Sequence, residues 1–249
     1  FGGGEGETAL VGQATNVTLT EASISNDIYG GGDAAPVTKT TTVTASKTKA
    51  QNVYGGGRGN TAIVRGIASI IINNESKFQK TYGGGAAALL DNNTETTVSN
   101  STIGTVYGGG ANAQVSGYTT LNISNSTITD VYGGGEGNDA TVVGQINAII
   151  KDTIINNNVY GGGNNGKSNS DIYVTMNNTK IANEVYGAGQ GTNSTVTGNT
   201  YISTGDQTTV GANVFGGGAY GPLTGNTSVI INEQSKVNST IYGGGNNAV

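Results

Sequence analysis

Two glycine-rich patterns in the sequence could bind phosphate. Residues 161–168, GGGNNGKS, fit the phosphate-binding pattern G-x-x-x-x-G-K-[ST], and G-x-G-x-x-G begins at Gly161 and Gly216. These loops bind phosphate when they lead from a strand into a helix whose first amides face the ligand. The next residues, 169–174, read NSDIYV and predict a loop and a strand. We therefore expect no nucleotide and no other cofactor here.

Charged residues offer little for metal binding or catalysis. Residues 134–139, GGEGND, match the start of a calcium-binding nonapeptide, but that architecture needs the motif every nine residues. The chain has no His and no Cys, which removes the commonest metal ligand, the usual acid–base group and any thiolate. Asp and Glu are spread along the chain without the carboxylate cluster that polysaccharide-cleaving β-helices use. We predict that the protein is not an enzyme and has no metal site, although weak calcium binding by acidic loops stays open.

The glycines in these patterns belong to a repeat that spans the chain. An aromatic residue followed by Gly-Gly-Gly, or once by Gly-Ala-Gly, recurs ten times, and the intervals between the aromatics are 25 to 29 residues. The aromatics are Phe1, Tyr29, Tyr54, Tyr82, Tyr107, Tyr132, Tyr160, Tyr186, Phe215 and Tyr242. A period of this size is typical of a solenoid, in which each repeat buries its apolar face only against its neighbours.

Each repeat predicts short β-strands and no helix. In 107–132, Leu121 and Ile123 alternate with polar residues, Ile128 begins a segment that runs into Val131, and Val115 precedes a glycine. Period-two alternation predicts strands, and the intervening Asn and Ser residues predict turns. We therefore predict an all-β fold, a parallel β-helix of about nine coils of 25–29 residues with three short strands per coil. Residues 1–249 are expected to form one continuous solenoid, an excerpt or subunit of a longer array or fibre.

The repeated aromatic has two interpretations. The first is a structural ladder, Tyr29, Tyr54, Tyr82, Tyr107, Tyr132, Tyr160, Tyr186, Phe215 and Tyr242, in which the rings of successive coils stack. The second is an exposed strip that binds sugar rings. Phe replaces Tyr at two of the ten positions, which indicates that the hydroxyl is not required. The residue two before each aromatic is polar and is expected to face water. After the glycines, Glu5, Asp33 and Arg58 either pair or form a solvated loop.

The charge balance limits the partners. The net charge is −5, and the 11 Lys and Arg residues are scattered singly, which argues against a nucleic-acid partner. No apolar run approaches the roughly 20 residues that a membrane-spanning helix needs.

The repeats resemble those of a known class of surface proteins. Segments of the type Asn-Val-Tyr-Gly-Gly-Gly, alternating with Thr-x-Val-x-Ile, are similar to the β-strand repeats of large adhesin-like surface proteins of bacteria and archaea. The resemblance implies an extracellular or cell-surface rod that serves as a stalk, filament or adhesive element and carries no catalytic set. Its expected partners are other copies stacked end to end or neighbouring repeats of the same chain, and a host or glycan surface. The alternative is a carbohydrate-binding or, less favoured, polysaccharide-degrading β-helix that uses the aromatic strip.

Overall fold

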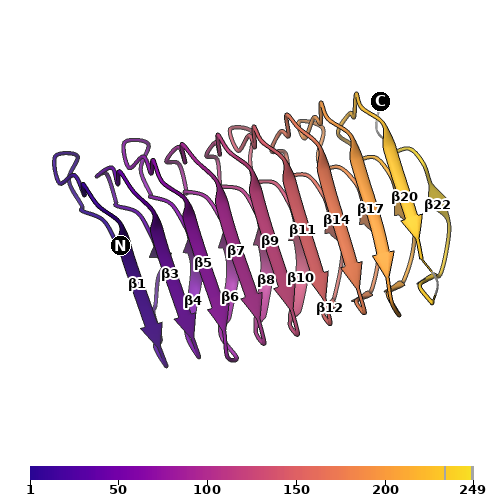
Figure 1. The fold of residues 1–249 in the computed structure, drawn as a ribbon, viewed down its shortest axis with the longest axis horizontal. Coiled ribbons are helices and arrows are strands. Elements are labelled where there is room, and N and C mark those ends of the chain that lie inside the picture. Colours follow the sequence, from indigo (N-terminus) through magenta and orange to yellow (C-terminus); the bar gives the residue numbers. More distant parts are fainter. Residues whose placement is uncertain (233, 248–249) are drawn as a thin grey trace.

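The alternating residues of each repeat form strands that lie side by side along one axis (Figure 1). This computed structural model describes residues 1–232 and 234–247, and the chain over those residues is a parallel β-solenoid without a helix. The predicted fold class is therefore confirmed. The expected domain, 1–249, includes residues 233 and 248–249, which lie outside the described part. No helix that could cross a membrane occurs in the described residues.

The first sheet contains one strand from each coil. Its nine strands, in spatial order, are β1 (Thr15–Thr20), β3 (Thr41–Ser46), β5 (Ala68–Asn73), β7 (Thr94–Ser99), β9 (Thr119–Ser124), β11 (Ile146–Lys151), β14 (Ile172–Asn177), β17 (Thr200–Gly205) and β20 (Thr227–Ile231). All pair in parallel, and each residue pairs with its equivalent in the next coil, as Leu121 does with Ala148. The sheet edges therefore lie at the two ends of the rod (Figure 1).

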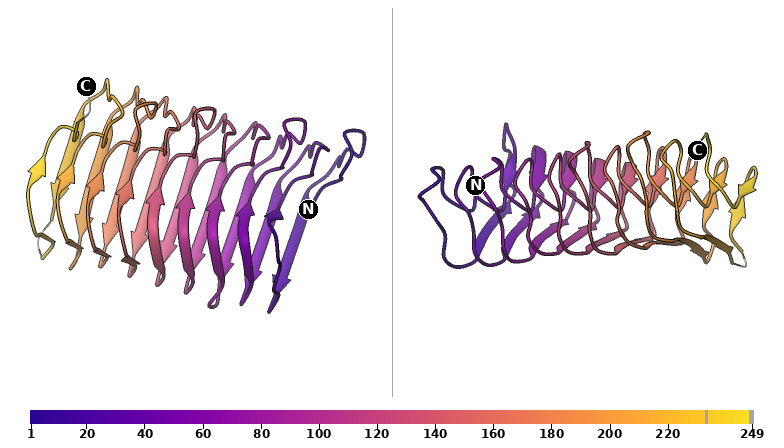
Figure 2. Two further views of the ribbon diagram at one scale, coloured as in Figure 1. Left: turned by 180° about the vertical axis from the view of Figure 1, so that it is seen from behind. Right: turned by 90° about the horizontal axis from the view of Figure 1, so that it is seen from above.

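The second sheet lies behind the first (Figure 2). Its thirteen strands are β2 (Ile28–Tyr29), β4 (Lys49–Tyr54), β6 (Lys77–Tyr82), β8 (Thr102–Tyr107), β10 (Thr127–Tyr132), β12 (Ile154–Ile155), β13 (Val159–Tyr160), β15 (Lys180–Ile181), β16 (Val185–Tyr186), β18 (Thr209–Val210), β19 (Val214–Phe215), β21 (Lys236–Val237) and β22 (Ile241–Tyr242). From β12 onward each coil carries one extra residue at this place, because Thr127 pairs with Ile154 whereas Val131 pairs with Val159. The extra residue divides one six-residue strand into two short ones.

The third side of each coil is a single paired residue. Val37, Val64, Leu90, Val115 and Val142 form one parallel ladder of isolated bridges through consecutive coils. These residues are buried, and with the inward residues of the two sheets they form one continuous aliphatic core. The sequence pattern of a Val or Leu shortly before a glycine marks this side, but only one residue per coil pairs there.

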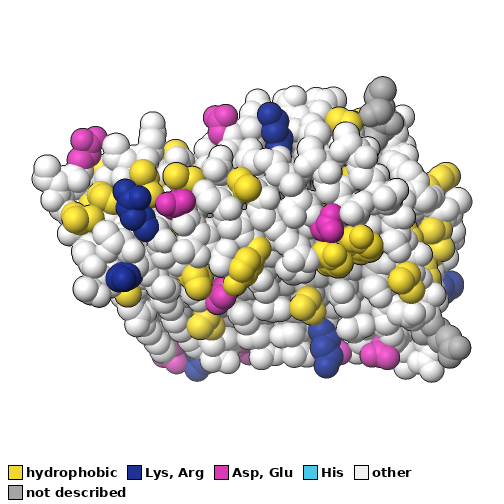
Figure 3. All heavy atoms as spheres, turned by 45° about the horizontal axis from the view of Figure 1, so that its top comes forward, with side chains coloured by type: hydrophobic (Ala, Val, Ile, Leu, Met, Phe, Trp, Pro, Cys, Tyr) yellow, Lys and Arg dark blue, Asp and Glu magenta, His cyan; other side chains and the backbone are white. Residues whose placement is uncertain are grey.

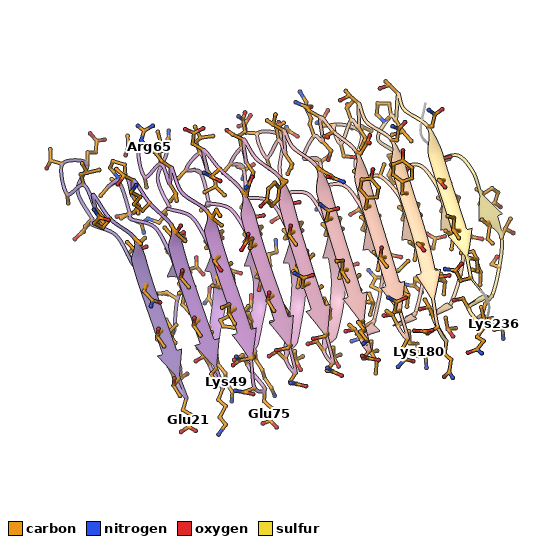
Figure 4. All side chains as sticks on the ribbon, in the orientation of Figure 1. Glu21, Lys49, Arg65, Glu75, Lys180 and Lys236 are labelled. Atoms are coloured by element: carbon orange, nitrogen blue, oxygen red, sulfur yellow. The ribbon has the colours of Figure 1, made fainter. Side chains whose placement is uncertain are left out.

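The corner between the two sheets uses residues that adopt left-handed backbone angles. Asn100, Asn125 and Asp152 follow the long strands with φ of 45°, 47° and 50°. Asn and Asp tolerate this region better than most residues, which explains the turn signal in the sequence. Many charged side chains also gather at this corner. In Figure 4, Glu21, Lys49, Glu75, Lys180 and Lys236 lie along this edge of the molecule, whereas Arg65 lies on the opposite edge.

The glycine after the aromatic permits the closest approach between coils. An added Cβ on Gly108 would lie 2.2 Å from the carbonyl oxygen of Gly133 in the next coil. Thr119 occupies the same corner, and its Oγ1 donates a hydrogen bond of 3.1 Å to that oxygen. The contact recurs along the rod, since Thr94 bonds Gly108 and Thr200 bonds Gly216 in the same way. Glycine is therefore required at this first position by steric exclusion.

This close approach predicts the effect of adding one methyl group. Gly108→Ala should lower the free energy of unfolding by about 1–3 kcal/mol or more, because the backbone of the next coil must move. Gly12→Ala is the matched control, since no atom lies within 4 Å of its added Cβ. Urea denaturation of both variants measures the difference. Equal losses in the two variants would contradict the steric argument.

Candidate functional site

The repeated aromatic side chains form one stacked column along the rod. Neighbouring ring centroids are 4.6–5.0 Å apart and the ring planes differ by no more than 13°. The column runs through Phe1, Tyr29, Tyr54, Tyr82, Tyr107, Tyr132, Tyr160, Tyr186, Phe215 and Tyr242. Each spacing equals the distance between neighbouring strands, since the rings ride on strands that pair in register.

The column lies outside the aliphatic core but is covered. Val53 points inward, so Tyr54 at the next position points to the opposite face, and the rings form a cluster separate from the core. Between the first and last rings the side chains are only 2–8% exposed. Each ring face contacts a neighbouring ring, so the column offers no free face on which a sugar could stack between its ends. Phe1 and Tyr242, at the ends, are 54% and 45% exposed.

One carboxylate connects two adjacent tyrosines and a lysine. Glu136 accepts a hydrogen bond from the Tyr82 hydroxyl at Oε2 and from the Tyr107 hydroxyl at Oε1, the latter at 3.2 Å. Lys80 Nζ lies 2.9 Å from both oxygens. Although burial raises the pKa of Glu136, the bonds from Tyr82 and Lys80 and the charge of Lys80 outweigh burial and hold it below its usual value. The carboxylate is therefore ionised and fixed over the column.

The contacts to this column skip one coil. Glu136 follows the third glycine of the coil that begins at Tyr132, two coils after Tyr82. Gln190 likewise accepts a hydrogen bond from Tyr132, two coils earlier. Arg58 lies 5.3 Å from the centroid of the Phe1 ring, again two coils earlier. At three of the equivalent positions, Ala86, Ala111 and Ala219 pack directly against the rings. The loop after the glycines therefore leans back along the rod and covers the phenols.

Other carboxylates contact the column from within the same coil. The Tyr29 hydroxyl donates to Oδ2 of Asp27 at 3.2 Å, and Tyr186 donates to Glu184. Asn52 donates to Asp27 at 2.8 Å from the next coil. These residues stand two before an aromatic, where the sequence analysis expects side chains that face water. The structure instead turns them toward the phenol edge, so the hydroxyl that Phe lacks has partners in most of the column.

The motifs that resemble binding loops have other roles. After Gly161–Ser168 the chain enters β14 and no helix, Ser168 is buried in the third-side ladder, and Lys167 is exposed. No group of three or more acidic residues placed to hold a metal occurs in 1–232 or 234–247. Of the two options for the post-glycine loops, pairing holds for Asp33 and Arg58, whose Oδ2 and Nη2 atoms lie 2.7 Å apart.

Comparison with known proteins gives no relative. No protein-family model matches the chain, and no curated protein or solved structure matches it.

The hydrogen bonds of the column predict different costs for removing two phenol oxygens. Tyr82→Phe should lower the free energy of unfolding by about 1–2 kcal/mol, because it deletes a bond to an ionised carboxylate. Tyr54→Phe should change it by less than about 0.5 kcal/mol, since within the described residues the Tyr54 hydroxyl makes no hydrogen bond. Urea denaturation compares the two variants. A larger loss for Tyr54→Phe would show that the partners are assigned wrongly.

The column also predicts a loss of stability at alkaline pH. Burial is the largest cause that raises the pKa of each tyrosine from Tyr29 to Tyr186, to about 12 for Tyr54 and Tyr160, and nearby carboxylates add to the effect. Unfolded tyrosines ionise at about pH 10. Above that pH the unfolded state holds fewer protons, so the urea midpoint should be constant below pH 10 and fall as pH rises through the folded pKa values. An absorbance titration in which all tyrosines ionise together at pH 10 would disprove this.

Proposed function

We propose that the chain is a non-catalytic extracellular rod that serves as a structural or adhesive element of a cell-surface stalk or filament. The observation that carries the proposal is the continuity of the solenoid: two sheets, the third-side ladder and the aromatic column run through consecutive coils. Because each coil is bonded to the next on every side, bending must disturb several ladders at once. A stiff spacer is the role that this construction supports best.

The outer surface supports a structural role better than a concave binding site. The outward side chains of the first sheet are mostly small and polar, for example Thr18, Thr44, Thr97, Asn122 and Thr175. Figure 3 presents hydrophobic, acidic and basic side chains as scattered groups without one continuous patch. Such a face suits weak, repeated contacts with a host or glycan surface. It lacks the basic stripe that a nucleic acid would require.

The ends of the rod suggest how longer structures form. At the outermost described coil, Ile241 continues the inward column of Val214 but is 48% exposed, and Tyr242 leaves one ring face free. At the other end, Phe1 and the edge of β1 are open. Unpaired strand edges template further pairing. The neighbour that covers them is either a further repeat of the same chain or a second copy stacked end to end.

The alternative, a glycan-binding module with an aromatic strip, needs free ring faces. The column has such faces only at its ends, so we do not adopt this alternative. A surface location draws its support from the resemblance of the repeats to those of adhesin-like proteins. Labelling of intact source cells with antibodies against the chain tests it, and labelling only after lysis would reject it.

End-to-end stacking predicts the behaviour of the 249-residue chain. Purified protein should form rods of several lengths in electron micrographs and a sedimentation coefficient that rises with concentration. Ile241→Asp should abolish this association, because it places a charge on the contact surface. Ile230→Asp is the matched control, since Ile230 is 53% exposed on the outer face of β20. Isolated short rods at every concentration would reject stacked subunits and leave neighbouring repeats of one chain as the covering partner.

A further inference from the structure

Seven consecutive members of the column are tyrosines. From Tyr29 to Tyr186 the rings follow one another in six steps of 4.6–5.0 Å, without a phenylalanine between them. The steps keep the ring planes nearly parallel, so the π systems of neighbours overlap along the whole run. Packing alone does not require this composition, because Phe215 occupies the same column with the same spacing. A phenol differs from a benzene ring in being far easier to oxidise by one electron.

Oxidation of a phenol requires a partner for its proton. At neutral pH these tyrosines are protonated, since burial raises their pKa values above 10. A phenol that loses an electron becomes strongly acidic, so the electron leaves easily only where a base already accepts the hydroxyl hydrogen. Four of the seven tyrosines donate to a carboxylate: Tyr29 to Asp27, Tyr82 and Tyr107 to Glu136, and Tyr186 to Glu184.

Glu136 is placed to serve two neighbouring rings. Its Oε2 accepts from Tyr82 and its Oε1 from Tyr107, and these rings stack at 4.9 Å. Lys80 Nζ, 2.9 Å from both oxygens, fixes the carboxylate between them. A proton released by either ring therefore has an acceptor that is already hydrogen-bonded to it.

We propose that the tyrosine run from Tyr29 to Tyr186 conducts single oxidising equivalents along the rod, received from a one-electron oxidant. When the equivalent reaches Tyr82, that ring loses one electron to the preceding acceptor, which is reduced by one electron, and its phenolic proton moves to Oε2 of Glu136. The product is a neutral tyrosyl radical. An electron from Tyr107 then fills the radical, the proton returns from Oε2 to the Tyr82 oxygen, and the Tyr107 proton moves to Oε1. Only O–H bonds break and form.

The run ends where the column changes composition. Phe215 separates Tyr186 from Tyr242 by two stacking steps, and its ring has neither a low oxidation potential nor a proton to release. At the other end, Tyr29 lines a surface hollow with Asp27 and Gln51, where a small oxidant can come near the first phenol. The equivalent therefore enters near Tyr29 and is held at Tyr186.

The sequence allows a site-specific test on the whole chain. Because there is no native Cys, Gln51→Cys can carry a single ruthenium polypyridyl photo-oxidant. At position 186, 3-aminotyrosine keeps the shape of tyrosine and traps the radical, since it is oxidised more easily. After a flash with an external electron acceptor, transient absorption and electron paramagnetic resonance measure the aminotyrosyl radical at 186. We expect this radical to form in the parent, with a yield that does not depend on protein concentration.

Three variants decide the outcome. Tyr107→Phe, which keeps a stackable ring, should abolish most of the signal at 186, and Glu136→Gln, which removes the base, should delay it. Tyr118→Phe should change nothing, because Tyr118 is exposed and lies outside the column. Circular dichroism checks the fold, and Tyr132→Phe replaces Tyr107→Phe if that variant misfolds. Absence of the radical in the parent, or an unchanged signal in the Phe variants, would overturn the proposal.

Discussion

The structure depends on the fixed distance between neighbouring β-strands. Every coil must repeat its backbone at the strand spacing of about 4.8 Å, so any side chain at an equivalent position meets a copy of itself at that distance. An aromatic ring fits this interval as a stack, and the observed centroid distances of 4.6–5.0 Å follow from it. The glycine beside the ring is required for the same reason, since a Cβ on Gly108 would meet the next coil at 2.2 Å. Ring and glycine are thus two answers to one constraint, because one fills the interval between coils and the other leaves it free.

The fold could be predicted from the sequence because a solenoid is encoded locally. The alternation of Leu121 and Ile123 identifies an inward-facing strand, and the interval from one Tyr to the next identifies the coil. Residues with weak β signals follow their neighbours: β3, rich in Thr and Lys, pairs in register with β1 and β5 although Val43 and Ala45 are its only apolar residues. Here pairing with adjacent coils overrides local composition.

The candidate site was less predictable, because its contacts depend on how the loops lean. The sequence places Glu136 beside Tyr132, its own aromatic, whereas the structure places it on Tyr82 and Tyr107. A displacement of two coils cannot be obtained from a repeat pattern, which aligns equivalent residues without indicating the tilt of a loop. One signal was present, because Ala and polar residues alternate irregularly after the glycines while every other column is uniform. Each of these residues answers to a ring two coils earlier.

The extra residue in the second sheet has a consequence for how such a rod can lengthen. From β4 to β10 the segment that ends at the aromatic is continuous, and from β12 onward it is one residue longer in every coil. Coils of one length therefore occur in contiguous blocks, because each loop rests on a loop of the same size. Duplication within a block preserves that fit, whereas exchange of single coils between blocks breaks it twice. The heritable module of this protein is the block, and the coil is only its subdivision.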